Sequence, residues 1–326
     1  MTPALARVTL VVGTAMWGLT FTANHQLLVT LTPAEITTLR FAMVGGVLVA
    51  LFAARPELRP RFSVRGWLLV ALGGVLAVPG AQLALTHGQQ YLSPTMSGLV
   101  AAAGPAFAAL LAVVILAERL RPRGWLGIAV AFVGASTVVL FTSGTGTDLT
   151  VQSPSGAAFV ALAQLCWAGY TVLSKRLVAT STPVTVVGTA VLIGVASLAP
   201  AVPGAVRAAG GLGLAEWGWL AHLAVLGTLL PYLIWSTALR HLQANETVVF
   251  MFLIPLFAGL WSALLLGERP AGVGLVGGAA IVIGVTLTQT AGLGARSAPP
   301  VAEGAPASGG VEPAAVDGSE SVDPQA

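Results

Sequence analysis

Apolar runs that carry no charge alternate with short charged clusters along most of this sequence. A bilayer core about 30 Å thick is crossed by about 20 apolar residues of α-helix, and several of the runs reach that length once they are divided at Gly, Pro and Ser. The pattern predicts an all-α integral membrane protein with ten transmembrane helices, at residues 8–28, 34–54, 67–86, 95–117, 124–141, 155–174, 185–203, 217–239, 247–266 and 272–289.

The positive charges favour one orientation of these ten segments. With the N-terminus placed in the cytoplasm, twelve of the 15 Lys and Arg residues fall on the cytoplasmic side, only Arg207 and Arg269 fall outside, and Arg40 lies within the second segment. Lys and Arg accumulate in cytoplasmic loops, so this bias predicts a multi-pass protein of the inner (cytoplasmic) cell membrane with both termini cytoplasmic. Glu118 and Glu268 close the fourth and ninth segments, where we expect them to anchor the helix ends at the interface.

The composition excludes a soluble globular protein. Hydrophobic residues make up 56% of the chain and charged residues 8%, whereas charged residues make up about 25% of a soluble domain. The basic residues lie in short loops without interleaved aromatic residues, so we expect no nucleic-acid partner. Cys166 is the only cysteine, which excludes an intramolecular disulfide and a cysteine-based metal site, and we expect neither a metal nor a cofactor.

The end of the chain differs from the rest in composition. From residue 292 onward it is rich in Pro, Ala, Gly, Ser and acidic residues. Such a segment buries too little apolar surface to offset its loss of chain entropy on folding. We predict a disordered cytoplasmic tail at 292–326.

The two halves of the sequence match at an offset of 150 residues without a gap. Chance rarely aligns two Trp pairs, a Pro pair and a Glu-Arg pair in one register, so we infer an internal duplication. The clearest matches are Trp17/Trp167, Trp67/Trp217, Pro105/Pro255, Glu118/Glu268, Arg119/Arg269, Gly127/Gly277 and Gly134/Gly284.

The duplication predicts two five-helix units, at residues 1–146 and 150–291. Because each unit holds an odd number of spans, the second must be inserted upside down relative to the first. Inverted repeats allow a transporter to expose one site alternately to the two sides of the membrane. The alternative is that the duplication builds a membrane scaffold that transports nothing.

Several motifs carry a resemblance to a known family. The first segment contains MWGLTF, the second contains LRF, and GPAFAALLAVVILAERLRPRGW in the first half is echoed by IPLFAGLWSALLLGERPAGVG in the second. In this order the motifs resemble those of EamA-type transporters of the drug/metabolite transporter superfamily, over residues 8–289. The resemblance implies a ten-span exporter or importer of amino acids, metabolites or drugs, often driven by exchange of protons or of another solute.

Two prolines interrupt equivalent segments of the two halves. Pro105 and Pro255 lie inside the fourth and ninth segments, and a proline in a helix removes one backbone hydrogen bond and displaces the preceding turn. Paired interruptions in the two halves of a transporter point to a binding site or hinge. We predict a hinge at Pro105 and Pro255, and the alternative is a static kink that aids packing.

Two tryptophans lie deeper in the membrane than tryptophan usually does. Trp17 and Trp167 fall near the middle of their segments, whereas Trp in membrane proteins prefers the headgroup region. Each shares a helix face with polar and aromatic side chains, which suits a cavity that orients an otherwise apolar ligand. The alternative is ordinary packing between helices. The substrate-binding residues predicted from these faces are Trp17, Phe21, Asn24, Gln164, Trp167 and Tyr170.

Three further polar residues within the spans are candidates for binding. Arg40 is the one charge well inside a segment, and its planar donors suit a carboxylate or phosphate of the substrate. Two alternatives remain for Arg40, namely that it reaches to the outer interface or pairs with a helix carbonyl. Gln82 and His87 lie in the outer half of the third segment and are candidates for solute hydrogen bonding or proton coupling.

The motifs of enzymes, motors and pores are not found in this sequence. It contains no HExxH, GxSxG or GxxxxGK[ST] motif, and no ring of like charges is evident. We therefore expect a secondary transporter, with export favoured, for a small organic metabolite, amino acid or drug. Its expected partners are the solute, the lipid bilayer and a coupled proton or counter-solute, while the oligomeric state stays open. The alternatives are a passive channel or a scaffold that does not transport.

Overall fold

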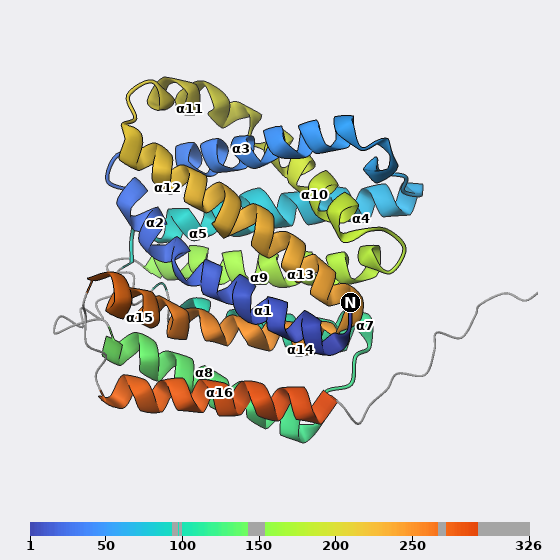
Figure 1. The fold of residues 1–326 in the computed structure, drawn as a ribbon, viewed down its shortest axis with the longest axis vertical. Coiled ribbons are helices and arrows are strands. Elements are labelled where there is room, and N and C mark those ends of the chain that lie inside the picture. Colours follow the sequence, from blue (N-terminus) through green and yellow to red (C-terminus); the bar gives the residue numbers. More distant parts are fainter. Residues whose placement is uncertain (93–96, 98–99, 143–153, 267–271, 293–326) are drawn as a thin grey trace, which may run out of the picture. The chain divides into compact units, whose positions relative to one another are not determined.

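The structure, a computed structural model, describes residues 1–92, 97, 100–142, 154–266 and 272–292. Over these residues all regular secondary structure is helical and no strand is present. The all-helical part of the predicted fold is therefore confirmed (Figure 1). The predicted tail lies almost entirely outside the described residues, as do Glu268, Arg269 and the first part of the predicted fourth segment.

The helices fall into two sets that correspond to the two halves of the sequence. The first set is α1 (Pro3–Gly18), α2 (Thr20–Leu27), α3 (Pro33–Ala54), η1 (Pro56–Leu58), α4 (Val64–Val75), η2 (Leu76–Leu83), α5 (Ala84–Gly88), α7 (Gly104–Leu116) and α8 (Pro122–Thr142). The second set is α9 (Pro154–Val178), α10 (Pro183–Ser197), η3 (Ala199–Ala201), α11 (Val202–Ala209), α12 (Leu214–Ala224), η4 (Val225–Leu229), α13 (Leu230–His241), α14 (Ala244–Val248), η5 (Val249–Phe252), α15 (Leu253–Leu266) and α16 (Gly272–Gly292).

Several helices are long and apolar enough to cross a membrane. Within the described residues there are five, at Pro3–Leu27, Pro33–Ala54, Val64–Gly88, Pro154–Val178 and Leu214–His241, and a sixth if the bent pair formed by Pro183–Ser197 and Ala199–Ala209 is one span. Shorter apolar helices occupy Gly104–Leu116, Ala244–Ala258 and Val276–Thr290. The number ten stays a prediction.

The outward faces of these helices are apolar. Val8 on α1, Leu68 on α4, Val114 on α7 and Val276 on α16 are each at least 60% exposed. A soluble protein rarely exposes so much apolar surface, but a surface that faces lipid tails requires it. The chain is therefore an integral membrane protein.

Thr-Pro pairs begin three of the helices. Thr2, Thr32 and Thr182 are the N-caps of α1, α3 and α10, and in each case the hydroxyl accepts a backbone N–H of the first turn. The proline that follows occupies the first helical position, where its missing N–H costs no hydrogen bond. Thr32 and Thr182 are 150 residues apart, so the two sequence repeats share this local structure.

Helices α8 and α16 occupy equivalent places in the two halves of the sequence and pack side by side (Figure 1). A Cβ atom on Gly127 would lie 2.6 Å from the carbonyl oxygen of Gly284, and one on Gly134 would lie 2.7 Å from that of Gly277. Going from Gly127 to Gly134 along α8, the contact on α16 moves back from Gly284 to Gly277, so the two helices are antiparallel. Small residues of this kind let helix backbones approach closely in lipid.

This close approach predicts that Gly127→Ala destabilises the protein. The new methyl group would lie 2.3 Å from Thr288 Oγ1 and 2.6 Å from the backbone of α16. We expect the strain to lower the free energy of unfolding by about 1–3 kcal/mol, which thermal unfolding in detergent would register as a lower Tm.

Gly46→Ala on α3 is the matched control, because no atom lies within 4 Å of the position that its new Cβ would take. This change should leave the Tm unchanged or raise it, since Ala favours a helix more than Gly does. Equal effects of the two substitutions would contradict the packing described for α8 and α16.

The third and eighth predicted segments each contain a π-helix. Segment η2 begins at Leu76 and η4 begins at Val225, one residue from the position that the 150-residue offset would give. Pro79 lies inside η2, and Pro231 follows η4 in the first turn of α13. A proline ring clashes with the carbonyl four residues before it, and a turn widened by one residue relieves the clash.

Two predicted segments differ from the helices observed. The segment predicted at 185–203 is not one continuous helix. Helix α10 ends at Ser197, and the chain then bends by 53° through the turn that contains Pro200 before α11 begins. The predicted segment 95–117 contains a turn at Ala102 and Ala103, after which α7 begins at Gly104. In both cases the hydropathy of the segment is continuous but a proline ends the regular hydrogen bonding.

Candidate functional site

A cluster of buried aromatic side chains lies where α1, α9 and α13 meet. Trp167 of α9 is at its centre, with ring centroids 5.5 Å from Trp17, 5.1 Å from Tyr232, 5.2 Å from Tyr170 and 5.8 Å from Trp235. All five side chains are at most 9% exposed. We call Trp17, Trp167, Tyr170, Tyr232 and Trp235 the aromatic cluster.

Arg40 of α3 lies against this cluster and is 3% exposed. Its Nη2 donates to the carbonyl oxygen of Gly227 at 2.8 Å, and Trp17 Nε1 donates to the same oxygen at 3.1 Å. That carbonyl is available because the residue four positions later is Pro231, which has no N–H to donate. The proline after η4 thus creates the acceptor that joins Arg40 to the aromatic cluster.

The other donors of Arg40 bind two side chains. Arg40 Nε donates to Thr228 Oγ1 at 2.6 Å, and Nη1 donates to Gln82 Oε1 at 3.0 Å. Thr228 belongs to η4 and Gln82 to η2, so the guanidinium bridges the two π-helices. Its Cζ atom also lies 5.3 Å from the ring centroid of Phe41. The alternative in which Arg40 reaches to the interface is wrong, and pairing with a helix carbonyl is observed.

Several polar atoms of the aromatic cluster have no hydrogen-bond partner among the described residues. Trp167 Nε1 is the clearest case, and the hydroxyls of Tyr170 and Tyr232 also lack a hydrogen bond of normal geometry, although Ser174 and Gln82 lie near them. In contrast, Trp235 Nε1 donates to Thr171 Oγ1 at 3.3 Å. Unpaired buried donors are rare in proteins and indicate a place where a ligand or water completes the hydrogen bonding.

Phe21 and Asn24 lie apart from this cluster, on α2. Asn24 is buried and donates from Nδ2 to Gln89 Oε1 at 3.3 Å, while Asn24 Oδ1 has no partner among the described residues. Phe21, His25 and Gln89 line a cavity of about 10 Å³ beside it. A cavity of this size has room for about one water molecule and not for a solute.

His87 and Gln164 also lie outside the aromatic cluster. The His87 ring packs against Phe159 with a centroid separation of 4.5 Å and against Tyr91 at 5.3 Å. Gln164 lies over Gly104, where a Cβ atom would come within 2.3 Å of its Oε1. The predicted binding residues therefore divide: Trp17, Arg40, Gln82, Trp167 and Tyr170 lie together, whereas Phe21, Asn24, His87 and Gln164 do not join them.

The two prolines proposed as hinges follow breaks in helical geometry. Pro105 is in the first turn of α7, directly after the turn at Ala102 and Ala103. Pro255 is the third residue of α15, which follows the 3₁₀-helix η5. Both positions are therefore places where the helix changes its hydrogen-bonding pattern, as a proline requires.

A polar network joins several helices at the end of the bundle that holds the N-terminus. Glu118, just after α7, accepts the backbone N–H groups of Ala244 and Asn245 at 2.7 and 3.0 Å. These N–H groups begin the Ala244–Ala258 helix, so the carboxylate caps it and complements its dipole. The sequence predicted only interfacial anchoring for Glu118, because a cap supplied from 126 residues away leaves no local signal.

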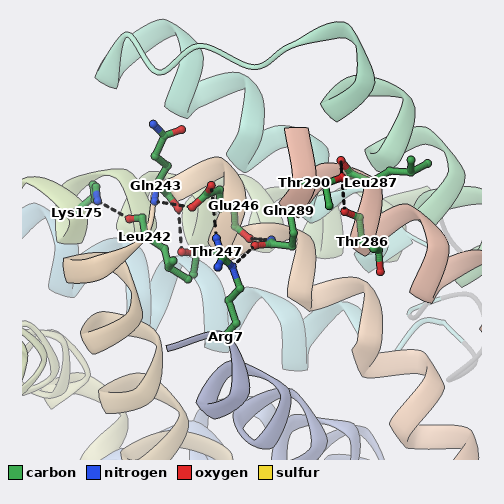
Figure 2. Close-up of polar contacts among 10 residues, drawn as sticks. All are labelled: Arg7, Lys175, Leu242, Gln243, Glu246, Thr247, Thr286, Leu287, Gln289 and Thr290. Atoms are coloured by element: carbon green, nitrogen blue, oxygen red, sulfur yellow. Dashed lines mark hydrogen bonds and ion pairs between the residues drawn. The ribbon is translucent and has the colours of Figure 1, made fainter. Parts of the chain in front are cut away.

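The same network continues through α1, α9 and α16, as Figure 2 shows. Arg7 Nε donates to Gln289 Oε1 at 2.8 Å, and its Nη2 lies 3.9 Å from Glu246 Oε1. Gln289 Nε2 donates to the backbone oxygen of Glu246 at 2.6 Å. Lys175 donates to the carbonyls of Leu239 and Leu242 at the end of α13. We call Arg7, Glu118, Lys175, Glu246 and Gln289 the end network.

Sequence reasoning missed Tyr232, Trp235, Thr228 and Gly227 at the centre of the site. The repeat register could have found Tyr232, since it is 150 residues after Gln82. Pro231, four residues after Gly227, signals a free carbonyl in that helix.

Over the described ranges, no three His, Cys, Asp or Glu side chains gather as metal ligands.

The sequence is similar to several proteins that are named as transporters. An "Uncharacterized transporter" of Archaeoglobus fulgidus is 29% identical over 276 residues, which cover 85% of this chain and 95% of that protein. A "Probable terminal-alkyne amino-acid exporter" of Streptantibioticus cattleyicolor is 29% identical over 239 residues, 73% of this chain and 77% of its own. The inner membrane transporter YhbE of Escherichia coli is 29% identical over 260 residues, 76% and 77% of the two chains.

A crystal structure shares the fold, with a TM-score of 0.70, 19% sequence identity, and coverage of 88% of this chain and 97% of that one. The model of the EamA-like transporter family matches twice, at residues 5–140 and 154–290. Together the two matches cover both sequence repeats and confirm the resemblance seen in the motifs. The chain is a membrane transporter that belongs to the EamA-like transporter family.

Proposed function

We propose that this protein is a secondary transporter that exports a small organic solute, such as a metabolite, amino acid or drug, across the cytoplasmic membrane by alternating access. In this proposal ten spans form two five-helix units of opposite orientation, with both termini in the cytoplasm. The observation that carries it is the antiparallel packing of α8 and α16, the equivalent last helices of the two units. Two equivalent helices that run in opposite directions are what an inverted repeat requires.

Two further pairs of helix contacts support the same relation between the units. Helix α7 packs on α9, and its equivalent α15 packs on α1, the equivalent of α9. Likewise α4 packs on α10, and α12 packs on α3. Each of these two contacts has a counterpart with the units exchanged, which is the arrangement that an exchange of conformations between the units requires.

The aromatic cluster and Arg40 are the proposed solute site. Their side chains come from α1, α3, α9 and α13, so both units contribute to one site. The end network lies at one end of this bundle and joins helices of both units. We propose that it closes the cytoplasmic side of the site, because the charge pattern places Arg7 in the cytoplasm. Export is supported by the name of the Streptantibioticus cattleyicolor relative.

Pro105 and Pro255 are the proposed hinges for this motion. Replacing both by Ala restores the missing N–H groups and stiffens the helices, so we expect a severalfold slower exchange without a lower Tm. Exchange in proteoliposomes and thermal unfolding measure the two effects. Pro56→Ala, at an exposed position in the η1 turn, is the control. Unaltered exchange in the double variant would remove the hinge role.

Counterflow tests the function directly. Metabolite profiles of a deletion strain and an overproducing strain identify the solute, which is then loaded inside proteoliposomes. A carrier takes up labelled solute faster when unlabelled solute is present on the far side, whereas a passive channel or a scaffold shows no acceleration. Failure of every accumulated metabolite to give counterflow would reject the proposal.

The orientation of the units needs a separate test. In a Cys166→Ser background, single cysteines at Arg119 and Arg269 occupy equivalent places in the two repeats. A membrane-impermeant thiol reagent applied to intact cells is expected to label the cysteine at 269 and not the one at 119. Labelling of both from the same side would contradict the inverted arrangement.

A further inference from the structure

The charge of Arg40 is not neutralised within the described residues. Its hydrogen bonds go to the Gly227 carbonyl, the Thr228 hydroxyl and the Gln82 amide, which are all neutral. Removing a charge from water is costly unless an opposite charge or metal compensates it, and neutral acceptors compensate only part of that cost. The site therefore favours an anion.

Every carboxylate that the structure describes is engaged elsewhere. Glu35 and Glu216 accept backbone N–H groups at the starts of α3 and α12, and Glu57 pairs with Arg55 in an exposed loop. Glu118 and Glu246 belong to the end network. No carboxylate among the described residues therefore supplies the negative charge that would pair with Arg40.

The polar atoms beside Arg40 add to the preference for an acceptor. Trp167 Nε1 can only donate, and it has no partner among the described residues. Tyr232 lies between Trp167 and Phe41, with ring centroids 5.1 and 6.4 Å away. Hydrogen-bond donors and apolar rings are thus buried side by side at Arg40. Such a site fits an oxyanion attached to an apolar body.

Gln82 is the partner of Arg40 that an oxyanion would replace. Its Oε1 is 3.0 Å from Arg40 Nη1, and unlike Thr228 it is only half-buried. A carboxylate in its place would form a charge-assisted bond, which is stronger than the bond to a neutral amide. Gln82 Oε1 therefore occupies the position that one carboxylate oxygen would take.

We propose that the transported solute is an organic monocarboxylate, whose carboxylate pairs with Arg40 and whose apolar body lies against Trp17, Trp167 and Tyr232. This inference rests on the proposed transport function and names the class of solute. A single guanidinium neutralises one negative charge and matches the planar fork of a carboxylate. A phosphate dianion would keep an unpaired charge among aromatic rings.

Binding to the purified full-length protein tests the proposal. The probes are phenylacetate, indole-3-acetate and L-phenylalanine, each with its primary amide, and inorganic phosphate. Intrinsic tryptophan fluorescence and the Tm in detergent report binding. At least one carboxylate is expected to bind about tenfold or more tightly than its amide, as a charge-assisted bond predicts, and Arg40→Gln should abolish the preference. Equal binding of acid and amide, no binding of any acid, or binding of phosphate alone would overturn it.

Gln82→Glu is a second variant that keeps Arg40 in place. It puts a carboxylate beside the guanidinium, so the protein without solute should gain Tm while the affinity for carboxylates falls and that for amides does not. An unchanged carboxylate affinity would contradict the proposal, even if Arg40→Gln fails to fold. Arg207→Gln, at an exposed arginine that binds the Pro203 carbonyl, is the control and should change neither quantity.

The outcomes separate this inference from the proposed function. Carboxylate binding that depends on Arg40, without counterflow in proteoliposomes, would reject transport and leave the site assignment intact. Counterflow of a neutral solute that Arg40→Gln does not alter would retain transport and reject the monocarboxylate.

Discussion

Replacing Glu118 by Ala is expected to lower the free energy of unfolding by about 2–3 kcal/mol. The carboxylate accepts two backbone N–H groups, from Ala244 and Asn245, and no other acceptor for them is described. In the variant both donors begin the Ala244–Ala258 helix without a partner, in a region where Asn245 is 1% exposed. Thermal unfolding in detergent measures the loss.

The same change should open the end network. Glu118 lies in the first EamA-like match and Ala244 and Asn245 lie in the second, so the contact joins the two halves of the chain at this end. A reporter cysteine at Asn245, in a Cys166→Ser background, is suitable because the Asn245 side chain has no partner among the described residues. Its alkylation should become faster in the Glu118→Ala variant.

Glu57→Ala is the matched control for both measurements. It pairs with Arg55, and both side chains are more than 60% exposed. Exposed ion pairs contribute little to stability. The control should leave Tm and alkylation unchanged. If Glu118→Ala behaves in the same way, the end network does not close this side of the protein.

The second large effect is expected at Trp167. It contacts four other rings of the site and is 5% exposed, so Trp167→Ala would remove the centre of the aromatic cluster. Truncation of a buried aromatic side chain to Ala lowers the free energy of unfolding by about 3–5 kcal/mol. We expect little folded protein to be recovered, as measured by size-exclusion chromatography in detergent.

Trp167→Phe separates the roles of the ring and of its N–H. Because Trp167 Nε1 has no partner among the described residues, its loss costs the solute-free protein no described hydrogen bond, and the Tm should fall only slightly. Solute exchange should fall severalfold if the solute accepts that N–H. Trp235→Phe is the comparison, because it loses the hydrogen bond to Thr171 and should lower the Tm. Unaltered exchange in Trp167→Phe would exclude the indole N–H from solute binding.

The sequence was sufficient for the features that depend on composition and register. Hydropathy gave the all-helical membrane fold, and the 150-residue offset relates Thr32 to Thr182 and aligns the glycines that bring α8 and α16 together. Hydropathy could not locate the bend after Ser197 or the turn before Gly104, because these depend on backbone hydrogen bonds and not on the polarity of side chains.

The candidate site was only partly predictable for a similar reason. Trp17, Arg40 and Trp167 could be identified from the sequence because polar or bulky residues at mid-span are unusual. One hydrogen-bond acceptor of Arg40 is the backbone carbonyl of Gly227, and a residue without a side chain gives no sign of this role in the sequence. Helical periodicity also fails across a π-helix, since one extra residue rotates all later side chains by about 100° relative to a regular helix.

The two π-helices have a consequence for the history of the chain. Such helices are rare, yet η2 and η4 begin within one residue of the same place in each repeat. Two independent insertions at one register are a poor explanation for this agreement. A widened turn that was already present in a single ancestral repeat accounts for the agreement, because duplication of that repeat would pass the turn to both halves.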